Sequence, residues 1–199
     1  MTEITIDLLR HGDVAGGKKL LGSTDTPLSE LGWQQVHSLA IEPWQKIVTS
    51  PLQRCHAFAE EISSQLSLPL EVNKQFQEVN FGQWDGQLLT DLYGSDDAEK
   101  LIQFIQSPST ITPPNGEAYN DFETRIMTAW QSLLTSLHED KIEHCLLVTH
   151  GGVIRTIISN ILGYPSTNLF RLEVPYACLS RIKQYDDYPP ILSFHGRNL

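Results

Sequence analysis

The chain has 199 residues, of which 40% are hydrophobic, and this length suits one domain with a core of ordinary size. Its 14 basic and 24 acidic residues give a net charge of −10, which argues against nucleic acid or an anionic membrane surface as the main partner. No apolar run approaches the ~18 residues that span a bilayer, and no basic stretch with an apolar core opens the chain. We therefore expect a soluble, cytoplasmic protein with no membrane partner.

The three cysteines, Cys55, Cys145 and Cys178, form neither an even set nor a metal-binding spacing. Each is predicted to be a buried small hydrophobic residue in a reducing compartment.

Strand and helix signals alternate along the first part of the chain. An apolar run over residues 4–9 predicts a strand, and Ser29 is expected to cap a helix that runs to about residue 39. A strand over residues 46–49 and a helix from Ser50 and Pro51 to about residue 66 follow. Residues 69–72 predict a short third strand.

The second part of the chain continues the alternation. Apolar residues recur from Phe122 to Leu137 at helical spacing, residues 144–149 predict a fourth strand, and residues 153–162 predict a helix. Three β-like runs are expected near Leu169, Leu179 and Leu192. The pattern indicates an α/β protein with βαβ units and a partly antiparallel end, in one domain over residues 1–199. Residues 81–121 are interpreted as an insertion within it.

Two predicted strands end in the same way. Arg10, His11 and Gly12 follow the first strand, and His150 and Gly151 follow the fourth. Ligands in open α/β sheets bind beyond the carboxyl ends of the strands. Two such ends therefore place two imidazoles at one crevice, which is the arrangement of an active site.

Further motifs accompany these histidines in a fixed order. They occupy residues 8–12, 22–32, 49–55, 78–86, 115–117 and 149–153. This succession resembles the histidine phosphatase superfamily, the phosphoglycerate mutase-like proteins, from the first strand to the helix after His150. The resemblance implies a three-layer α/β/α sandwich with a mostly parallel central sheet and a small helical insertion over the site. It also implies phosphoryl transfer through a phosphohistidine. No metal or other cofactor is expected, because arginine and imidazole side chains can hold the charge of the phosphoryl group.

The chemistry of the residues supports the same assignment. An imidazole is unprotonated near neutral pH, so His11 is the predicted nucleophile. The catalytic set is completed by Arg10 and Arg54 as forked donors, His150 as a cation or hydrogen-bond donor, and Glu78 as the proton donor and later base. The phosphate-binding set comprises Arg10, Gly12, Arg54, His150 and Gly151, whose backbone amide opens a helix.

Two features of the loop after His11 need separate interpretation. Residues 12–18 match the first seven places of a P-loop, but Lys19 stands where Ser or Thr would bind magnesium, which argues against a nucleotide site. The family commonly has an Asn at the place of Gly17, so Lys18 and Lys19 are candidates to replace its contact with phosphate. Asp13 stands where the family usually has Glu, and it either orients the site or is an exposed loop acid.

The charges of the insertion indicate what kind of leaving group the substrate has. Between residues 75 and 124 the only basic residue is Lys100, against nine acidic ones, which favours a small-molecule phosphomonoester with a neutral or cationic leaving group. The aromatic residues there are expected to pack against a flat ring or within the core: Trp84, Tyr93, Phe104, Tyr119 and Phe122. The alternatives are a mutase, a broad sugar-phosphate phosphatase, and a non-catalytic module that binds phospho-ligands. The oligomeric state, monomer or dimer, stays open.

Overall fold

The computed structural model describes residues 3–186 and 188–197 and contains a mixed six-stranded sheet. In sheet order the strands are β3 (Leu70–Val72), β2 (Lys46–Thr49), β4 (His144–Thr149), β1 (Glu3–Arg10), β5 (Leu179–Tyr185) and β6 (Tyr188–Arg197). The first four are parallel, whereas β5 runs antiparallel to β1 and β6 antiparallel to β5. The predicted mostly parallel sheet with an antiparallel end is confirmed.

The pairing of β1 with β4 positions the two predicted site histidines. Arg10, the last residue of β1, is paired with Thr149, the last residue of β4. Because the two strands are parallel and in this register, the residue after each strand lies at the same edge of the sheet. His11 and His150 therefore start from adjacent backbone positions.

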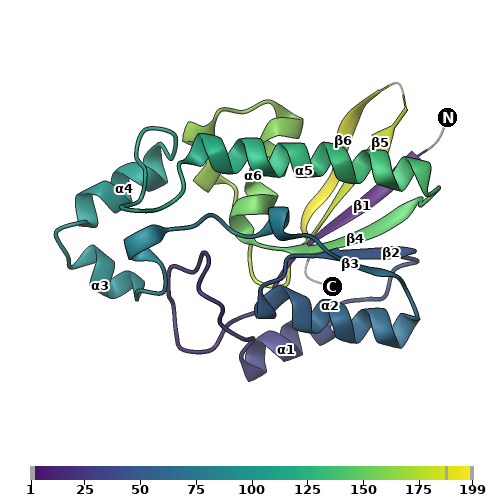
Figure 1. Ribbon diagram of the computed structural model, residues 1–199, viewed down its shortest axis with the longest axis horizontal. Coiled ribbons are helices and arrows are strands. Elements are labelled where there is room, and N and C mark those ends of the chain that lie inside the picture. The colour runs from purple at the N-terminus through teal and green to yellow at the C-terminus, as the bar shows by residue number, and fades with distance from the viewer. Residues whose placement is uncertain (1–2, 187, 198–199) are drawn as a thin grey trace.

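Helices cover both faces of the sheet, as Figure 1 shows. Helices α5 (Tyr119–Glu139) and α6 (Gly151–Leu162) pack on one face, and α1 (Glu30–His37) and α2 (Gln53–Leu66) on the other. Alternate strand residues supply the two cores, because successive side chains of a strand point to opposite faces. Leu8 thus packs with α5 and α6, whereas Leu9 packs with α1 and α2. This is the expected three-layer α/β/α sandwich.

The signals that begin and end the helices act as predicted, with small differences in bounds. The Ser29 hydroxyl accepts a hydrogen bond from the Gly32 amide at 3.0 Å and caps α1. Helix α6 begins at Gly151, two residues before the predicted start, and ends before Gly163, which is left-handed at φ 69°. Cys55, Cys145 and Cys178 are all buried and unpaired, as expected.

One predicted strand is wrong. Leu169 lies in a 3-10 helix, η3 (Ser166–Arg171), and not in an extended segment. Pro165 precedes this turn, and its carbonyl accepts a hydrogen bond from the Asn168 amide at 2.9 Å. Leu169 is the only buried residue of η3, at 2% exposure. One buried apolar position therefore resembled a strand in the sequence.

The segment interpreted as an insertion contains a 3-10 turn, η2 (Gly82–Trp84), and two short helices, α3 (Leu89–Tyr93) and α4 (Ala98–Gln106). In Figure 1, α3 and α4 lie at the left, beyond the ends of the strands and on the side where α6 begins. They are therefore placed to cover the edge of the sheet that carries the two histidines.

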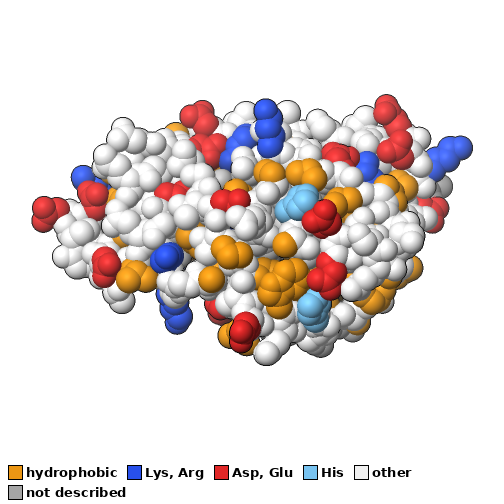
Figure 2. Space-filling view, turned by 60° about the horizontal axis from the view of Figure 1, so that its bottom comes forward, with side chains coloured by type: hydrophobic (Ala, Val, Ile, Leu, Met, Phe, Trp, Pro, Cys, Tyr) orange, Lys and Arg blue, Asp and Glu red, His pale blue; other side chains and the backbone are white. Residues whose placement is uncertain are grey.

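Charged side chains of both signs occur on one face of the molecule. On the face shown in Figure 2, Lys and Arg side chains stand scattered among Asp and Glu. Within the described residues, no helix is both long and apolar enough to cross a membrane.

Candidate active site

The backbone of His11 is fixed on both sides by neighbouring segments. Its amide donates to the Thr149 carbonyl at 3.0 Å, and its carbonyl accepts from the Ala177 amide at 3.1 Å. On the ring, Nδ1 lies 2.8 Å from the Gly12 carbonyl oxygen. Because a carbonyl oxygen can only accept, Nδ1 carries the hydrogen and Nε2 keeps its lone pair. The ring is thus oriented as a nucleophile on phosphorus requires.

His150 lies beside His11, with 5.3 Å between the ring centroids, and is fully buried. The Nε–H of Arg54 donates to its Nδ1 at 3.3 Å, so Nδ1 is the acceptor. The hydrogen then sits on Nε2, which lies 2.8 Å from the Ser50 hydroxyl. These contacts assign His150 as a neutral imidazole whose orientation is set by Arg54 and Ser50.

Burial and nearby cations keep both imidazoles neutral. Desolvation, followed by the charges of Arg10 and Arg54, lowers the pKa of His11 well below its usual value. Desolvation also lowers the pKa of His150, and Arg54 again contributes. This environment favours a neutral His150 over the cationic form that the sequence allowed.

Arg54 joins His150 to the loop that follows β1. Its side chain is fully buried, and its Nη1 and Nη2 donate to the carbonyls of Thr24 at 2.7 Å and Gly22 at 2.6 Å. The guanidinium therefore brings a buried positive charge to the two histidines and holds the loop over them.

One hydrogen-bond donor of Arg10, its Nε–H group, is unpaired among the described residues. Its Nη1 donates to the Val174 carbonyl at 2.5 Å, and its Cζ lies 4.0 Å from the centroid of the Tyr176 ring. Its Nε is buried without a hydrogen-bond partner among the described residues. A Cβ on Gly151 would lie 3.5 Å from this nitrogen, so the free donor borders the start of α6. Buried donors are normally satisfied, so this one suits an anionic ligand.

Glu78 is held at the N-terminus of α6. Its Oε2 accepts from the Gly152 amide at 2.9 Å, and its Oε1 accepts from the Val79 amide at 3.1 Å. A Cβ on Gly152 would lie 2.3 Å from Oε1, so this approach requires glycine. The carboxyl group and His11 line the same cavity.

That cavity has a volume of about 150 Å³ and brings together most of the predicted site. Arg10, His11, Glu78 and Gly151 line it, and fully buried Arg54 and His150 lie behind His11. The apolar wall includes the rings of Phe81, Phe104, Tyr119, Phe122, Phe170 and Tyr176. Of the other predicted aromatic residues, Trp84 is fully buried in the core and Tyr93 is 50% exposed.

Several residues of the predicted set do not face the cavity. Gly12 packs against α1, where an added Cβ would lie 2.3 Å from the Gly32 carbonyl oxygen. Asp13 accepts a hydrogen bond from the Ser29 hydroxyl at 2.6 Å and so supports the cap of α1. Lys19 lines the cavity, whereas Lys18 does not.

Sequence reasoning missed Arg155, Phe170 and Tyr176, which all line the cavity. Arg155 lies four residues after Gly151, a spacing that puts both on one face of α6, so its position carried a usable signal. Phe170 and Tyr176 come from η3 and the loop before β5, and no motif marks them.

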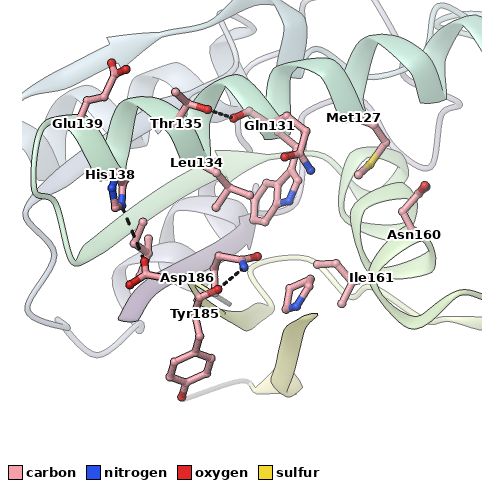
Figure 3. A pocket seen from close by; sticks show the side chains of 14 residues that line it. Met127, Gln131, Leu134, Thr135, His138, Glu139, Asn160, Ile161, Tyr185 and Asp186 are labelled. Carbon is pink, nitrogen blue, oxygen red and sulfur yellow. Dashed lines mark hydrogen bonds and ion pairs between the residues drawn. The ribbon is translucent and has the colours of Figure 1, made fainter. Parts of the chain in front are cut away.

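A larger hollow of about 770 Å³ lies between α5, α6 and the connection from β5 to β6. Figure 3 shows side chains of α5, among them Leu134 and His138, on one wall and Tyr185 and Asp186 opposite. None of the predicted site residues lines it, so the candidate site is the smaller cavity.

Comparison with known proteins assigns the chain to a family. The model of the histidine phosphatase superfamily (branch 1) matches residues 6–195. The chain therefore belongs to this superfamily.

The chain is also similar to individual proteins of known name. The chain is 28% identical over 196 residues to the adenosylcobalamin/alpha-ribazole phosphatase of Salmonella typhimurium, covering 96% of this chain and 95% of that protein. It is 29% identical over 187 residues to the bifunctional protein Rv2228c of Mycobacterium tuberculosis, with 90% of this chain but only 50% of that protein covered. The chain thus spans about half the length of this relative. The crystal structure of the alpha-ribazole phosphatase from Shigella flexneri has the same fold, with a TM-score of 0.84, 24% identity, and coverage of 98% and 97%.

Proposed function

We propose that this chain hydrolyses small phosphomonoesters through a phosphohistidine formed on His11. The observation that carries the proposal is the contact between His11 Nδ1 and the Gly12 carbonyl, which leaves the Nε2 lone pair free. His11 lines a cavity that Arg10 and Glu78 also line, and Arg54 is buried nearby. Family membership supports the same reaction.

In the first step, His11 Nε2 attacks phosphorus and the bond from phosphorus to the leaving oxygen breaks. Glu78 donates a proton to that oxygen, so the alcohol departs neutral. In the second step, water attacks the phosphohistidine and gives its proton to the Glu78 carboxylate, which releases inorganic phosphate and restores the imidazole. Arg10, the buried charge of Arg54 and the Gly151 amide stabilise the charge on the transferring group, while His150, held by Arg54 and Ser50, lies beside the ring of His11.

For the leaving group, we propose the benzimidazole riboside of alpha-ribazole 5′-phosphate, an intermediate in assembly of the cobalamin nucleotide loop. Two motifs support this choice: Glu78 followed by residues 81–84, and residues 114–117. The aromatic rings on the cavity wall give a flat base surfaces to pack against. The Salmonella and Shigella relatives are both named as alpha-ribazole phosphatases, which supports the same compound.

A panel of phosphomonoesters, assayed for phosphate release in the presence of a chelator, tests both parts of the proposal. The panel includes alpha-ribazole 5′-phosphate, sugar phosphates, 3-phosphoglycerate and p-nitrophenyl phosphate. We expect metal-independent release, with the highest kcat/KM for the riboside. Isomerisation of phosphoglycerate without release of phosphate would replace the phosphatase with the mutase alternative.

A further inference from the structure

The loop before β5, residues 172–178, is held by side chains from three elements of the fold. It connects η3 to β5, and three successive carbonyl groups in it each accept a hydrogen bond from a different element. The pairs are Leu172 with Arg155 Nε of α6 at 2.9 Å, Glu173 with His195 Nε2 of β6 at 2.6 Å, and Val174 with Arg10 Nη1 of β1 at 2.5 Å. These contacts fix the path of a loop that has no helix or strand of its own.

The same loop is bound to the backbone of two residues of the candidate site. The Ala177 amide donates to the His11 carbonyl at 3.1 Å, and the Cys178 carbonyl accepts from the Arg10 amide at 3.1 Å. Ala177 has a left-handed backbone conformation, with φ 52°, which a residue other than glycine seldom adopts. Such a conformation persists where surrounding contacts hold it, and here one of those contacts is to the proposed nucleophile.

The residue before Ala177 is Tyr176, whose ring lies next to both Arg10 and His11. The ring centroid is 4.0 Å from Arg10 Cζ and 5.6 Å from the centroid of the His11 ring. Tyr176 is half-buried and lines the cavity. Its neighbours Val174 and Ala177 pack into the cores on opposite faces of the sheet, so the core packing of the loop does not depend on Tyr176.

Two contacts from this loop set the orientation of the Arg10 guanidinium. The Val174 carbonyl binds Nη1, and the Tyr176 ring covers the group in a cation–π contact. The Nε atom is left buried and without a hydrogen-bond partner among the described residues, beside the start of α6. A planar group that is bound at one nitrogen and covered by a ring keeps one orientation, so its unpaired donor stays available to an anion.

We propose that Tyr176 is a positioning residue for phosphoryl transfer, because it holds the Arg10 guanidinium in the orientation that binds the transferring group. Donors that are already oriented stabilise transition-state charge without having to reorganise during the reaction. This inference rests on the proposed phosphomonoesterase reaction and adds to it a residue that no sequence motif marks.

A double-mutant cycle between Tyr176 and Arg10, with p-nitrophenyl phosphate as substrate, tests the inference. We expect Tyr176→Leu to lower kcat/KM about tenfold in the wild-type chain, the size of one cation–π contact, but less than about twofold in Arg10→Gln, which has no cation for the ring to cover. Tyr176→Phe keeps the ring and should recover most of the loss. Tyr93→Leu is the matched control, because Tyr93 of α3 is 50% exposed and does not line the cavity.

Equal losses in the two backgrounds would overturn the inference, because Tyr176 would then act on the leaving group or on the fold. An unchanged kcat/KM in folded Tyr176→Leu, or a loss in Tyr176→Phe as large as in Tyr176→Leu, would overturn it as well. If Tyr176→Leu does not fold, Tyr176→Met takes its place in the cycle.

The same cycle measured on the Kd of inorganic phosphate, by isothermal titration calorimetry, separates this inference from the proposed function, because binding requires no turnover. We expect the effects of Tyr176→Leu and Arg10→Gln on this Kd to be non-additive. Additive effects would refute only the inference on Tyr176. A wild-type chain that releases no phosphate from any ester refutes the proposed function.

Discussion

At the scale of single residues, the position of one hydrogen in His11 decides what the site can do. The Gly12 carbonyl fixes that hydrogen on Nδ1, while burial and two arginines keep the ring neutral. The same arginines are the charges that a transferring phosphoryl group requires. The proposed nucleophile and the proposed stabilisation of the phosphoryl charge therefore depend on the same contacts of His11, Arg10 and Arg54.

Arg10 gives the first prediction at this scale. Arg10→Lys keeps the charge but loses both the contact to the Val174 carbonyl and the free Nε donor. We expect kcat/KM to fall by about 10²- to 10³-fold, the usual cost of removing one preorganised donor. Steady-state kinetics on p-nitrophenyl phosphate, with exposed Arg171→Lys as the control, measure the loss. Near-wild-type kinetics in Arg10→Lys would refute the role of the forked donor.

Glu78 gives the second prediction. In single turnover, Glu78→Gln is expected to lose far more activity on an alkyl phosphate than on p-nitrophenyl phosphate, whose leaving group departs with little help from an acid. Glu117→Gln is the matched control, because both Glu117 oxygens lie 2.9 Å from Arg125 nitrogens. Equal losses on the two substrates in Glu78→Gln would remove Glu78 from the acid role.

At the scale of elements, a buried charge network joins the strands that carry the site. Asp7 of β1 is fully buried and accepts from Arg181 of β5 at 2.8 and 2.9 Å and from the Trp44 indole at 2.8 Å. His144 of β4 lies 2.9 Å from the same carboxylate. Removing the carboxylate would leave these donors without an acceptor, so the network supports the alignment of β1, β4 and β5.

This network makes the free energy of unfolding depend on pH. Burial alone would raise the pKa of Asp7, but hydrogen bonds from Arg181, His144 and Trp44 lower it overall. A lowered folded-state pKa gives stability that is present above the unfolded value of about 3.9 and lost as the pH falls through the folded value. We expect Asp7→Asn to lose about 3 kcal/mol of unfolding free energy at pH 7 and less below pH 4.

Urea unfolding at pH 7, 4 and 3 checks this expectation. Asp96→Asn, a change at an exposed position, serves as the control. A loss in Asp7→Asn that stays the same at all three pH values would show that the charge of Asp7 contributes nothing.

The sequence predicts the elements best where pattern and environment agree. The strands over 46–49 and 144–149 occur at their predicted bounds, because an apolar run there is buried on both faces. The start of α6 was predicted two residues late, because two glycines have low helix propensity, yet their lack of side chains lets Glu78 and Arg10 approach.

The site was predictable to the extent that its residues follow strands and motifs. His11 and His150 are paired by strand register, which the sequence indicates. The cavity position of Arg155 depends on the rotation of α6, and that of Tyr176 on a loop path fixed by tertiary contacts such as its stacking with Arg10. Secondary-structure propensity predicts neither the rotation of a helix about its axis nor the path of a loop.

At the scale of the whole molecule, the cavity is closed by segments distant in sequence. Phe104 of α4 and Phe170 of η3 lie 6.0 Å apart between ring centroids, which joins the insertion to the segment after α6. In the proposed reaction the leaving group fits between these elements, so we expect substrate choice to depend on the insertion more than on the sheet. That residues 1–199 form a single domain stays a prediction, which one cooperative unfolding transition would support.

Trapping of the phosphoenzyme tests the central claim most directly. Rapid quench of the wild-type chain with a ³²P-labelled monoester is expected to yield an acid-labile, alkali-stable phosphoprotein whose label maps to His11. His11→Ala should fold normally and carry no label, whereas His37→Ala, a change at a histidine bound to Glu61 away from the cavity, should label like the wild type. Phosphate release by the wild type without any trapped label, or label that persists in His11→Ala, would contradict the account.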